Sequence, residues 1–241
     1  MYAISLGDDG AELRPLEPWQ AEEFLAHMDR GREFIGARNG LPDVVTDLES
    51  SRAFLRLYAE KVAADSGRIH GIWSEGTLVG AVILRQLDTA RGTAEAGCWL
   101  EPAAVGRGLV TRAARTLIDW AIEVRGIHRV EWVVSTDNAP SIAVARRLGM
   151  SRDAVLRASH PYRGRRHDEE VWSVLAPEWR AARSASASAS AGDGVGVTAP
   201  STAGPAGPPG STAPGEGGRA RAATPGRSIP EAPRARRWTG R

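Results

Sequence analysis

Apolar residues recur every three or four positions between residues 107 and 124, which predicts an amphipathic helix with one buried face. Gly126 is expected to end this helix, because glycine readily adopts the left-handed conformation found after a helix C-terminus. The apolar face consists of Leu109, Val110, Ala113, Ala114, Leu117, Ile118, Ala121 and Ile122.

Runs in which apolar and polar residues alternate, or in which β-branched residues are frequent, predict the strands. Shorter segments with the apolar spacing of a helix predict three further helices. The strands are expected at 11–16, 69–74, 77–84, 93–100, 129–135, 154–159 and 168–175. The helices are expected at 18–30, after Thr46, and at 140–148. Thr46, with Glu49 three residues later, has the pattern of a capping box. The order of the elements predicts a mixed α/β fold with helices on the faces of one sheet.

The composition changes near Ala182 and divides the chain into two domains. Residues 1–183 have the size of one folded domain, whereas residues 184–241 are rich in Ala, Ser, Gly and Pro. A segment with so few large apolar side chains does not bury enough surface to offset its conformational entropy. We therefore expect 184–241 to be a disordered tail.

The tail carries the positive charge of the chain. Residues 184–241 contain seven arginines and three acids, a net charge of +4, which leaves −2 for residues 1–183 because the whole chain carries +2. The tail either keeps the protein soluble or makes weak contacts with RNA or another polyanion. It has one aromatic residue and no pattern of interleaved stacking residues, so no dedicated nucleic-acid site is expected.

The cysteine count, the N-terminal residues and the length of the apolar runs argue against disulfide-bonded, secreted and membrane-spanning proteins. Cys98 is the single cysteine, so neither a disulfide framework nor a cysteine-based metal site is expected. Acids interrupt the N-terminal residues early, unlike a signal peptide, and no apolar run approaches about 18 residues. We expect a cytoplasmic protein that makes no membrane contact.

A glycine turn, Gly106-Arg107-Gly108, lies directly before the long helix. Arg107 and Arg112 stand in the first turns of this helix, where positive charge is unfavourable unless an anion binds the positive end of the helix dipole. The glycines either only form a tight turn or form a cradle for phosphate. The run is not a P-loop, and Thr111 stands where a dinucleotide motif needs its third glycine.

Six short blocks stand in a fixed order within residues 11–177. They are Leu78-Val79-Gly80, Thr93-Ala94-Glu95-Ala96-Gly97-Cys98-Trp99-Leu100, Gly106-Arg107-Gly108, Asp137-Asn138-Ala139-Pro140-Ser141, Arg147-Leu148-Gly149-Met150 and His167-Asp168. Together they resemble the GNAT-family N-acetyltransferases, in particular the RimJ/RimL-like branch of ribosomal-protein N-terminal acetyltransferases. The resemblance implies the GNAT fold, a mixed α/β (α+β) architecture with flanking helices. Its central sheet would be mostly antiparallel with six to seven strands.

The resemblance also implies acetyl-CoA as co-substrate, and no metal. In such folds the pantetheine arm pairs with the strand before the glycine turn, here at Trp99 and Leu100, and Asn138 and Ser141 lie near the thioester. The pyrophosphate lies on backbone N–H groups of the turn, here Val105, Gly106, Arg107, Gly108, Leu109, Val110 and Thr111.

The family needs no covalent nucleophile, because a bound amine attacks the thioester directly in a ternary complex. Glu95 is the candidate base, since strand alternation places it on the same face as Trp99; otherwise it is a solvated strand glutamate. Ser141 is the candidate acid or hydrogen-bond donor for the leaving thiolate; otherwise it caps a helix. Tyr162 is a weaker candidate acid.

Two histidines are weaker site candidates, and two alanines mark departures from the family pattern. His160 and His167 are expected on the surface or in a substrate pocket, because no metal-ligand spacing joins them. The chain departs from the family pattern at Ala103, where the glycine motif often begins with Gln or Arg, and at Ala145, where many members place a tyrosine.

The resemblance leaves several function classes. The first is acetylation of a primary amine, most directly a protein N-terminal α-amine such as that of a ribosomal protein. The alternatives are a small-molecule amine acetyltransferase for an aminoglycoside or polyamine, a catalytically silent acyl-CoA-binding regulatory module, and an adaptor that binds RNA or ribosomes through the tail. The sequence leaves open the acceptor, acyl chains other than acetyl, and the oligomeric state, a homodimer included.

Overall fold

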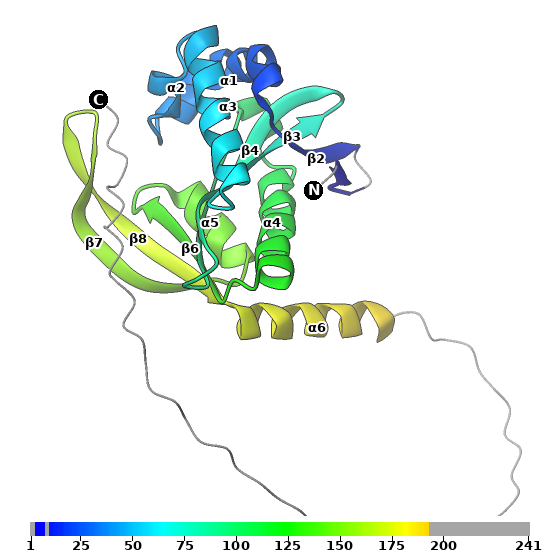
Figure 1. Cartoon of the computed structure of the whole chain (residues 1–241). Helices are drawn as coiled ribbons and strands as arrows, with labels where there is room; N and C mark the ends of the chain where they lie inside the picture. Colours follow the sequence, from blue (N-terminus) through cyan, green and yellow to red (C-terminus); the bar gives the residue numbers. More distant parts are fainter. Residues whose placement is uncertain (1–2, 8–9, 193–241) are drawn as a thin grey trace, which may run out of the picture. The chain divides into compact units, whose positions relative to one another are not determined.

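The computed structural model describes residues 3–7 and 10–192 of the chain. Within these residues one eight-stranded sheet runs in the order β1-β2-β3-β4-β5-β6-β8-β7 (Figure 1). Neighbouring strands are antiparallel except for β5 and β6, which are parallel. The strands are β1 (Ile4–Ser5), β2 (Ala11–Pro15), β3 (Arg68–Ser74), β4 (Thr77–Asp88), β5 (Thr93–Leu100), β6 (Arg129–Ser135), β7 (Ser151–Tyr162) and β8 (Arg165–Leu175). The mixed, mostly antiparallel sheet is confirmed, and the short strand β1 is the addition to the expected set.

Helices cover both faces of the sheet. Helices α1 (Ala21–Gly36) and α3 (Leu48–Ala63) pack on one face in a core that contains Phe24 and Trp99. Helices α4 (Leu109–Arg125) and α5 (Ala139–Arg147) pack on the other face, around Trp132. We call these the α1/α3 face and the α4/α5 face. The remaining helices are η1 (Pro18–Gln20), α2 (Leu41–Val44), η2 (Pro102–Ala104) and α6 (Ala176–Gly192).

Helix α4 has the apolar face that the sequence predicts. All its expected apolar residues are buried except Val110, which is partly buried. The helix begins at Leu109 and not at 107, because Gly108 has a φ of 70° and Gly106 one of 88°, outside the helical region. Gly126, with a φ of 68°, caps its C-terminus as expected.

The predicted cap of α3 is wrong by one residue. Asp47, not Thr46, is the N-cap, and its side chain accepts the backbone N–H of Ser50 over 2.8 Å. The Ser50 side chain in turn accepts the backbone N–H of Asp47 over 3.0 Å, so the reciprocal capping box is Asp47 with Ser50. Asp accepts hydrogen bonds as an N-cap as well as Thr does, and the sequence pattern alone does not choose between adjacent candidates.

The last two strands form a longer hairpin than the sequence predicts. Strand β7 extends to Tyr162 and β8 begins at Arg165, so the ladder continues to the tight turn between them. The phenol O–H of Tyr162 donates to the backbone carbonyls of Gly36 and, over 3.1 Å, of Asn39. These contacts tie the tip of the hairpin to Gly36, the last residue of α1, and to Asn39 just beyond it.

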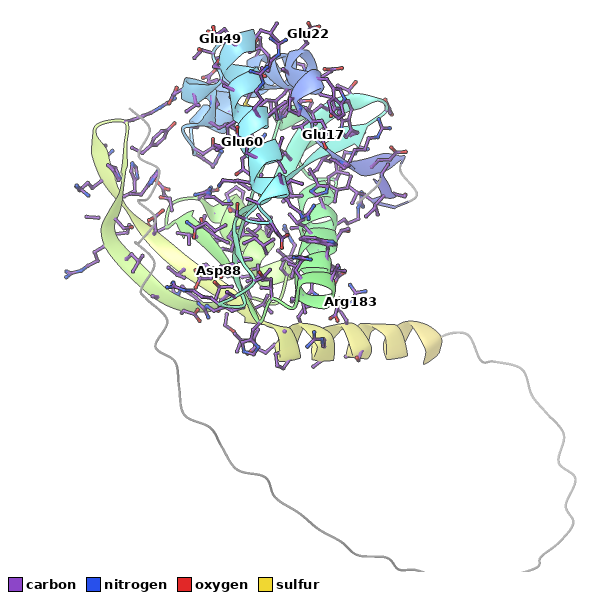
Figure 2. All side chains as sticks on the ribbon, viewed as in Figure 1. Glu17, Glu22, Glu49, Glu60, Asp88 and Arg183 are labelled. Carbon is purple, nitrogen blue, oxygen red and sulfur yellow. The ribbon has the colours of Figure 1, made fainter. Side chains whose placement is uncertain are left out.

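Helix α6 continues past the expected domain boundary at 183. It runs to Gly192, and the compact unit that contains the sheet extends to Ala189, so the described helix includes the first residues after the expected boundary. The alternating Ala and Ser residues there support a helix, because Ala has the highest helix propensity and Ser a moderate one. The first turns of α6 pack on α4: Trp179 Nε1 donates to Asp119 over 2.6 Å, and Arg183, labelled in Figure 2, pairs with the same carboxylate. Residues 193–241, the rest of the expected tail, lie outside the described residues.

Candidate active site

Strands β5 and β6 pair over only part of their length. Their parallel register joins Thr93–Ala96 to Arg129–Trp132 and, in the described strands, stops at the pair formed by Ala96 and Trp132. Beyond this pair β5 remains bonded to β4, and β6 to β8. The two strands therefore part, and each presents an edge whose backbone N–H and C=O groups have no strand partner on that side. We call this opening between β5 and β6 the fork.

The turn between β5 and α4 has the geometry of an anion cradle. Gly106 and Gly108 both have positive φ values, and a Cβ added at either would meet no atom within 4 Å. These glycines are therefore required by backbone conformation and not by lack of space. Gly108 is the N-cap of α4, so no side chain caps the helix, and its first turn contains no acid. The N–H groups of Leu109, Val110 and Thr111 are thus presented at the positive end of the helix dipole.

The two arginines of this region lie in the turn and in the first turns of α4. Arg107 Nη1 donates to Ser74 Oγ at the end of β3 over 2.9 Å, which fixes the turn against the sheet. Arg112 lies one helical turn further on, and its backbone N–H bonds to the carbonyl of Gly108 over 3.1 Å. The positive charge expected near the cradle is present, and Arg107 in addition has a structural role.

Trp99 and Leu100 lie on the β5 edge of the fork but point their side chains away from it. Trp99 is buried in the α1/α3 core, 6.3 Å from Phe24 between ring centroids, and its indole N–H has no hydrogen-bond partner. Leu100 packs against the α4/α5 core. The backbone N–H and C=O groups of Leu100 face the fork, whereas those of Trp99 face Ala81 of β4, so the predicted backbone contact with the cofactor fits Leu100 and not Trp99.

Ser141 lies at the vertex of the fork on the α4/α5 face. Its Oγ accepts a hydrogen bond of 2.9 Å from Nε1 of Trp132, the last β6 residue paired with β5. Its backbone N–H bonds to the side-chain Oδ1 of Asn138 over 3.3 Å, and Asn138 is the N-cap of α5. Asn138 is thus the cap, and the Ser141 side chain is directed at β6.

Glu95 lies one residue before the vertex, on the opposite face. By strand alternation it shares the α1/α3 face with Trp99, and its neighbour across the register is Glu131 of β6. Arg85 of β4 lies 3.3 Å from its carboxylate, and the side chain is about one-fifth exposed (20%). The structure therefore does not bring Glu95 and Ser141 into contact, but places them on opposite faces beside the same vertex.

The remaining candidates gather on the hairpin of β7 and β8. The rings of His160, Tyr162 and His167 lie 5.8 to 6.5 Å apart between centroids. His160 Nδ1 is 3.9 Å from Glu169, and His167 Nδ1 is 3.6 Å from Asp137. Burial raises the pKa of Tyr162, and its O–H donates to the carbonyls of Gly36 and Asn39, so its contacts are those of a structural anchor.

One cluster beside the turn, built around the buried carboxylate of Glu101, has no signal in the sequence. Glu101, directly after β5, lies 2.9 Å from Arg30 and 3.5 Å from His27, both on α1. Burial, with a contribution from Arg30, lowers the pKa of His27 to about 3. No motif joins residues 27, 30 and 101, so sequence analysis had no means to find this cluster.

The described residues also bear on metals, thiols and membranes. Among them no three side chains of His, Cys, Asp or Glu gather as a metal site would require. Burial raises the pKa of Cys98 to about 12, so this thiol has little thiolate character. No helix in the described part of the chain combines the length and apolar character needed to cross a membrane.

Comparison with known proteins identifies the fold. The family described as "Acetyltransferase (GNAT) domain" matches residues 11–151. The chain is similar to the probable N-acetyltransferase YjcK of Bacillus subtilis (strain 168), with 30% identity over 170 residues, 69% of this chain and 94% of the relative. It is also similar to the putative ribosomal N-acetyltransferase YdaF of the same organism, with 27% identity over 176 residues, 71% of this chain and 94% of the relative.

A solved structure agrees with this assignment. RimL, the ribosomal L7/L12 α-N-protein acetyltransferase in complex with coenzyme A, superimposes with a TM-score of 0.69 at 18% identity, over 72% of this chain and 97% of RimL. At this identity the likeness concerns the fold alone. Taken with the fork and the glycine cradle, the family match shows that the chain belongs to the GNAT acetyltransferases and is an N-acetyltransferase with acetyl-CoA as its co-substrate.

Proposed function

We propose that this chain acetylates the N-terminal α-amine of a protein, of the ribosomal-protein type. Two comparisons support this acceptor: YdaF is named a putative ribosomal N-acetyltransferase, and RimL is named for acetylating the α-amine of L7/L12. The chemistry agrees, because an α-amine has a pKa of about 7.7–8.0 and a lysine amine one of about 10.4. An α-amine is therefore far more often neutral and nucleophilic near pH 7, and it demands less of a protein base.

The fork and the cradle together are the observation that carries the donor side of the proposal, the binding of acetyl-CoA. The turn from Gly106 to Gly108 and the uncapped N-terminus of α4 up to Thr111 offer N–H groups for the pyrophosphate. The predicted contact at Val105 does not come from its N–H, which already donates to the carbonyl of Pro102 over 3.2 Å. The free edge of β5 at Leu100 offers backbone hydrogen bonds to the amide groups of the pantetheine arm, whereas the backbone groups of Trp99 face Ala81 of β4. A donor held at both places has its thioester at the vertex, next to Ser141 and near the Asn138 cap.

The positions of Glu95 and Ser141 suit the two sides of a direct displacement. The amine nitrogen forms a bond to the thioester carbon, and the bond from that carbon to sulfur breaks. We assign to Glu95, on the α1/α3 face, the proton that the amine loses. We assign to the Ser141 O–H, on the α4/α5 face, a hydrogen bond to the departing thiolate. Two groups on opposite faces of one vertex serve the entering and the leaving atom without competing for the same space.

Two measurements test the function in order. Calorimetric titration of the full chain with acetyl-CoA tests the donor site, and absence of binding would refute the proposal. Release of free CoA is then followed with N-terminal peptides, with the same peptides blocked at the α-amine, and with spermidine and an aminoglycoside. Turnover of the free peptides and not of the blocked ones is expected. Turnover of the small amines alone would assign the enzyme to small-molecule acceptors, and binding without turnover would indicate a regulatory module.

A further inference from the structure

Glu101 is the residue at which β5 passes into the cofactor-binding turn. Its backbone N–H donates to the carbonyl of Val79 over 2.9 Å, and its own carbonyl accepts the N–H of Ala104 over 3.2 Å. The first hydrogen bond joins the end of β5 to β4, and the second closes the η2 turn. The position of Glu101 therefore determines where the turn leaves the sheet.

The Glu101 side chain is buried against α1, with 6% of its side-chain surface exposed. Arg30 Nε donates to Glu101 Oε2 over 2.9 Å, and Nη2 of the same guanidinium donates to the carbonyl of Leu78 over 2.6 Å. One arginine thus holds the end of β5 and the start of β4 at the same time. These two contacts connect α1 directly to the base of the turn.

The positive charge that faces Glu101 comes from Arg30. His27 Nδ1 lies 3.5 Å from the same carboxylate oxygen, but His27 is neutral near pH 7 because burial lowers its pKa to about 3. Removing a carboxylate from water costs several kcal/mol, and an apolar pair of similar volume stabilises a fold equally well. A charged pair of this geometry fixes the relative orientation of the two side chains, since the planar guanidinium group forms its hydrogen bonds in few alternative arrangements.

The packing of α1 is shaped for this contact. A Cβ added at Gly31 would lie 3.4 Å from the Cβ of Glu101 and 2.6 Å from the Cδ1 of Ile35, so glycine allows the close approach of the helix. At the other end of the turn, Arg107 donates to Ser74 over 2.9 Å. Arginine contacts therefore hold both ends of the turn to elements outside it.

We propose that Glu101 is a positioning residue for acetyl-CoA, acting through Arg30. The pair fixes the end of β5 against α1, and so it holds the N–H groups of the turn in the arrangement that binds the pyrophosphate. This inference rests on the proposed function, because it takes the turn as the cofactor site. It predicts that loss of the pair weakens cofactor binding and leaves the chemical step unchanged.

The test measures CoA affinity by calorimetry and turnover at saturating acetyl-CoA in three variants. Glu101→Gln keeps the shape and removes the charge, and we expect its Kd for CoA to rise about ten-fold with little change in kcat. Arg30→Lys keeps the charge but cannot reach Glu101 and Leu78 together, so an intermediate rise is expected. Asp29→Asn is the matched control, because Asp29 pairs with Arg32 on the same helix at an exposed position, and its Kd should equal that of the wild type.

The outcomes separate this inference from the function on which it rests. If the wild-type protein binds no CoA, the proposed function is refuted and the variants are not needed. If the wild type binds and both Glu101→Gln and Arg30→Lys bind equally well, the inference is overturned, whatever their melting temperatures. Should Glu101→Gln not fold, the Kd of Arg30→Lys for CoA decides. That variant is expected to fold, because position 30 is partly exposed and lysine keeps the positive charge.

Discussion

Trp132 donates its indole N–H to the hydroxyl oxygen of Ser141 over 2.9 Å. Because the oxygen accepts this bond, the hydroxyl hydrogen is free to turn toward another acceptor. Trp132 is buried and is the last β6 residue paired with β5, so the hydroxyl is held at the vertex of the fork. The geometry thus gives Ser141 an orientation that a helix-capping serine would not need.

Replacing Ser141 by Ala should lower kcat by about 100- to 1,000-fold, the range seen when one preorganised donor to a developing anion is removed. The affinity for CoA should change little, because the cradle is at the other end of the cofactor. Steady-state kinetics with a peptide acceptor and a CoA titration measure the two effects. A variant with wild-type kcat would remove Ser141 from the chemistry.

Replacing Trp132 by Phe should reproduce part of the Ser141 effect. The ring still fills the core, but the hydroxyl loses the partner that orients it, so we expect a several-fold drop in kcat at unchanged KM for acetyl-CoA. Trp172 pairs with Trp132 across β6 and β8, and its N–H donates to Glu170 over 2.7 Å, so Trp172→Phe is the matched control. Equal kcat values for the two variants would contradict the orienting role.

Replacing Glu95 by Gln should lower kcat by about 100-fold, the usual contribution of a general base, and leave the Kd for CoA unchanged. Glu131 is its register neighbour on β6 and is likewise paired with an arginine, Arg129, at 2.8 Å. Glu131→Gln is therefore the control for a lost strand carboxylate and should keep wild-type kcat. If both variants lose activity equally, the effect is electrostatic or structural, and Glu95 is not the base.

Replacing Gly108 by Ala should weaken CoA binding about ten-fold. An L-residue in the left-handed conformation costs about 1–2 kcal/mol, so the turn relaxes and its N–H groups lose their alignment. Gly126, at the far end of the same helix, has nearly the same φ, 68° against 70°. Gly126→Ala should therefore lower the melting temperature by a similar amount and leave the Kd for CoA unchanged, as calorimetry and thermal unfolding would show.

Acid should destabilise the fold through its buried histidines. Burial lowers the pKa of His27 from 6.5 to about 3, so below pH 6.5 the unfolded chain binds a proton that the folded chain does not. This contribution to stability is present above pH 6.5 and is lost as the pH falls toward 3. At pH 5 it amounts to a loss of about 2 kcal/mol relative to pH 8.

Urea unfolding at pH 8, 6 and 5 measures this loss. His27→Gln should show a smaller decrease in the free energy of unfolding between pH 8 and pH 5 than the wild type. The exposed His128 provides the control, and His128→Gln should keep the wild-type dependence. His70, whose pKa burial lowers to about 4, should retain its own share of the decrease in both variants.

Local patterns predicted the parts of the site that are themselves local. The glycine turn and the apolar face of α4 were found correctly, because positive φ values and a 3.6-residue period leave a direct mark on the order of residues. The prediction that Glu95 shares a face with Trp99 rests on another local regularity, the two-residue alternation of a strand. The cap of α3 was missed by one residue because Thr46 and Asp47 are both good caps.

The order of residues is enough to predict the family blocks, the succession of strands and helices, and the cradle at the start of α4. Long-range packing separates β5 from β6 after Ala96 and Trp132, puts Ser141 and Glu95 on opposite faces of this vertex, and holds Glu101 against Arg30. The reason is physical: helix periods and turns are set by neighbours in the chain. The contacts of the site join residues many positions apart, and these follow from how the sheet and helices pack.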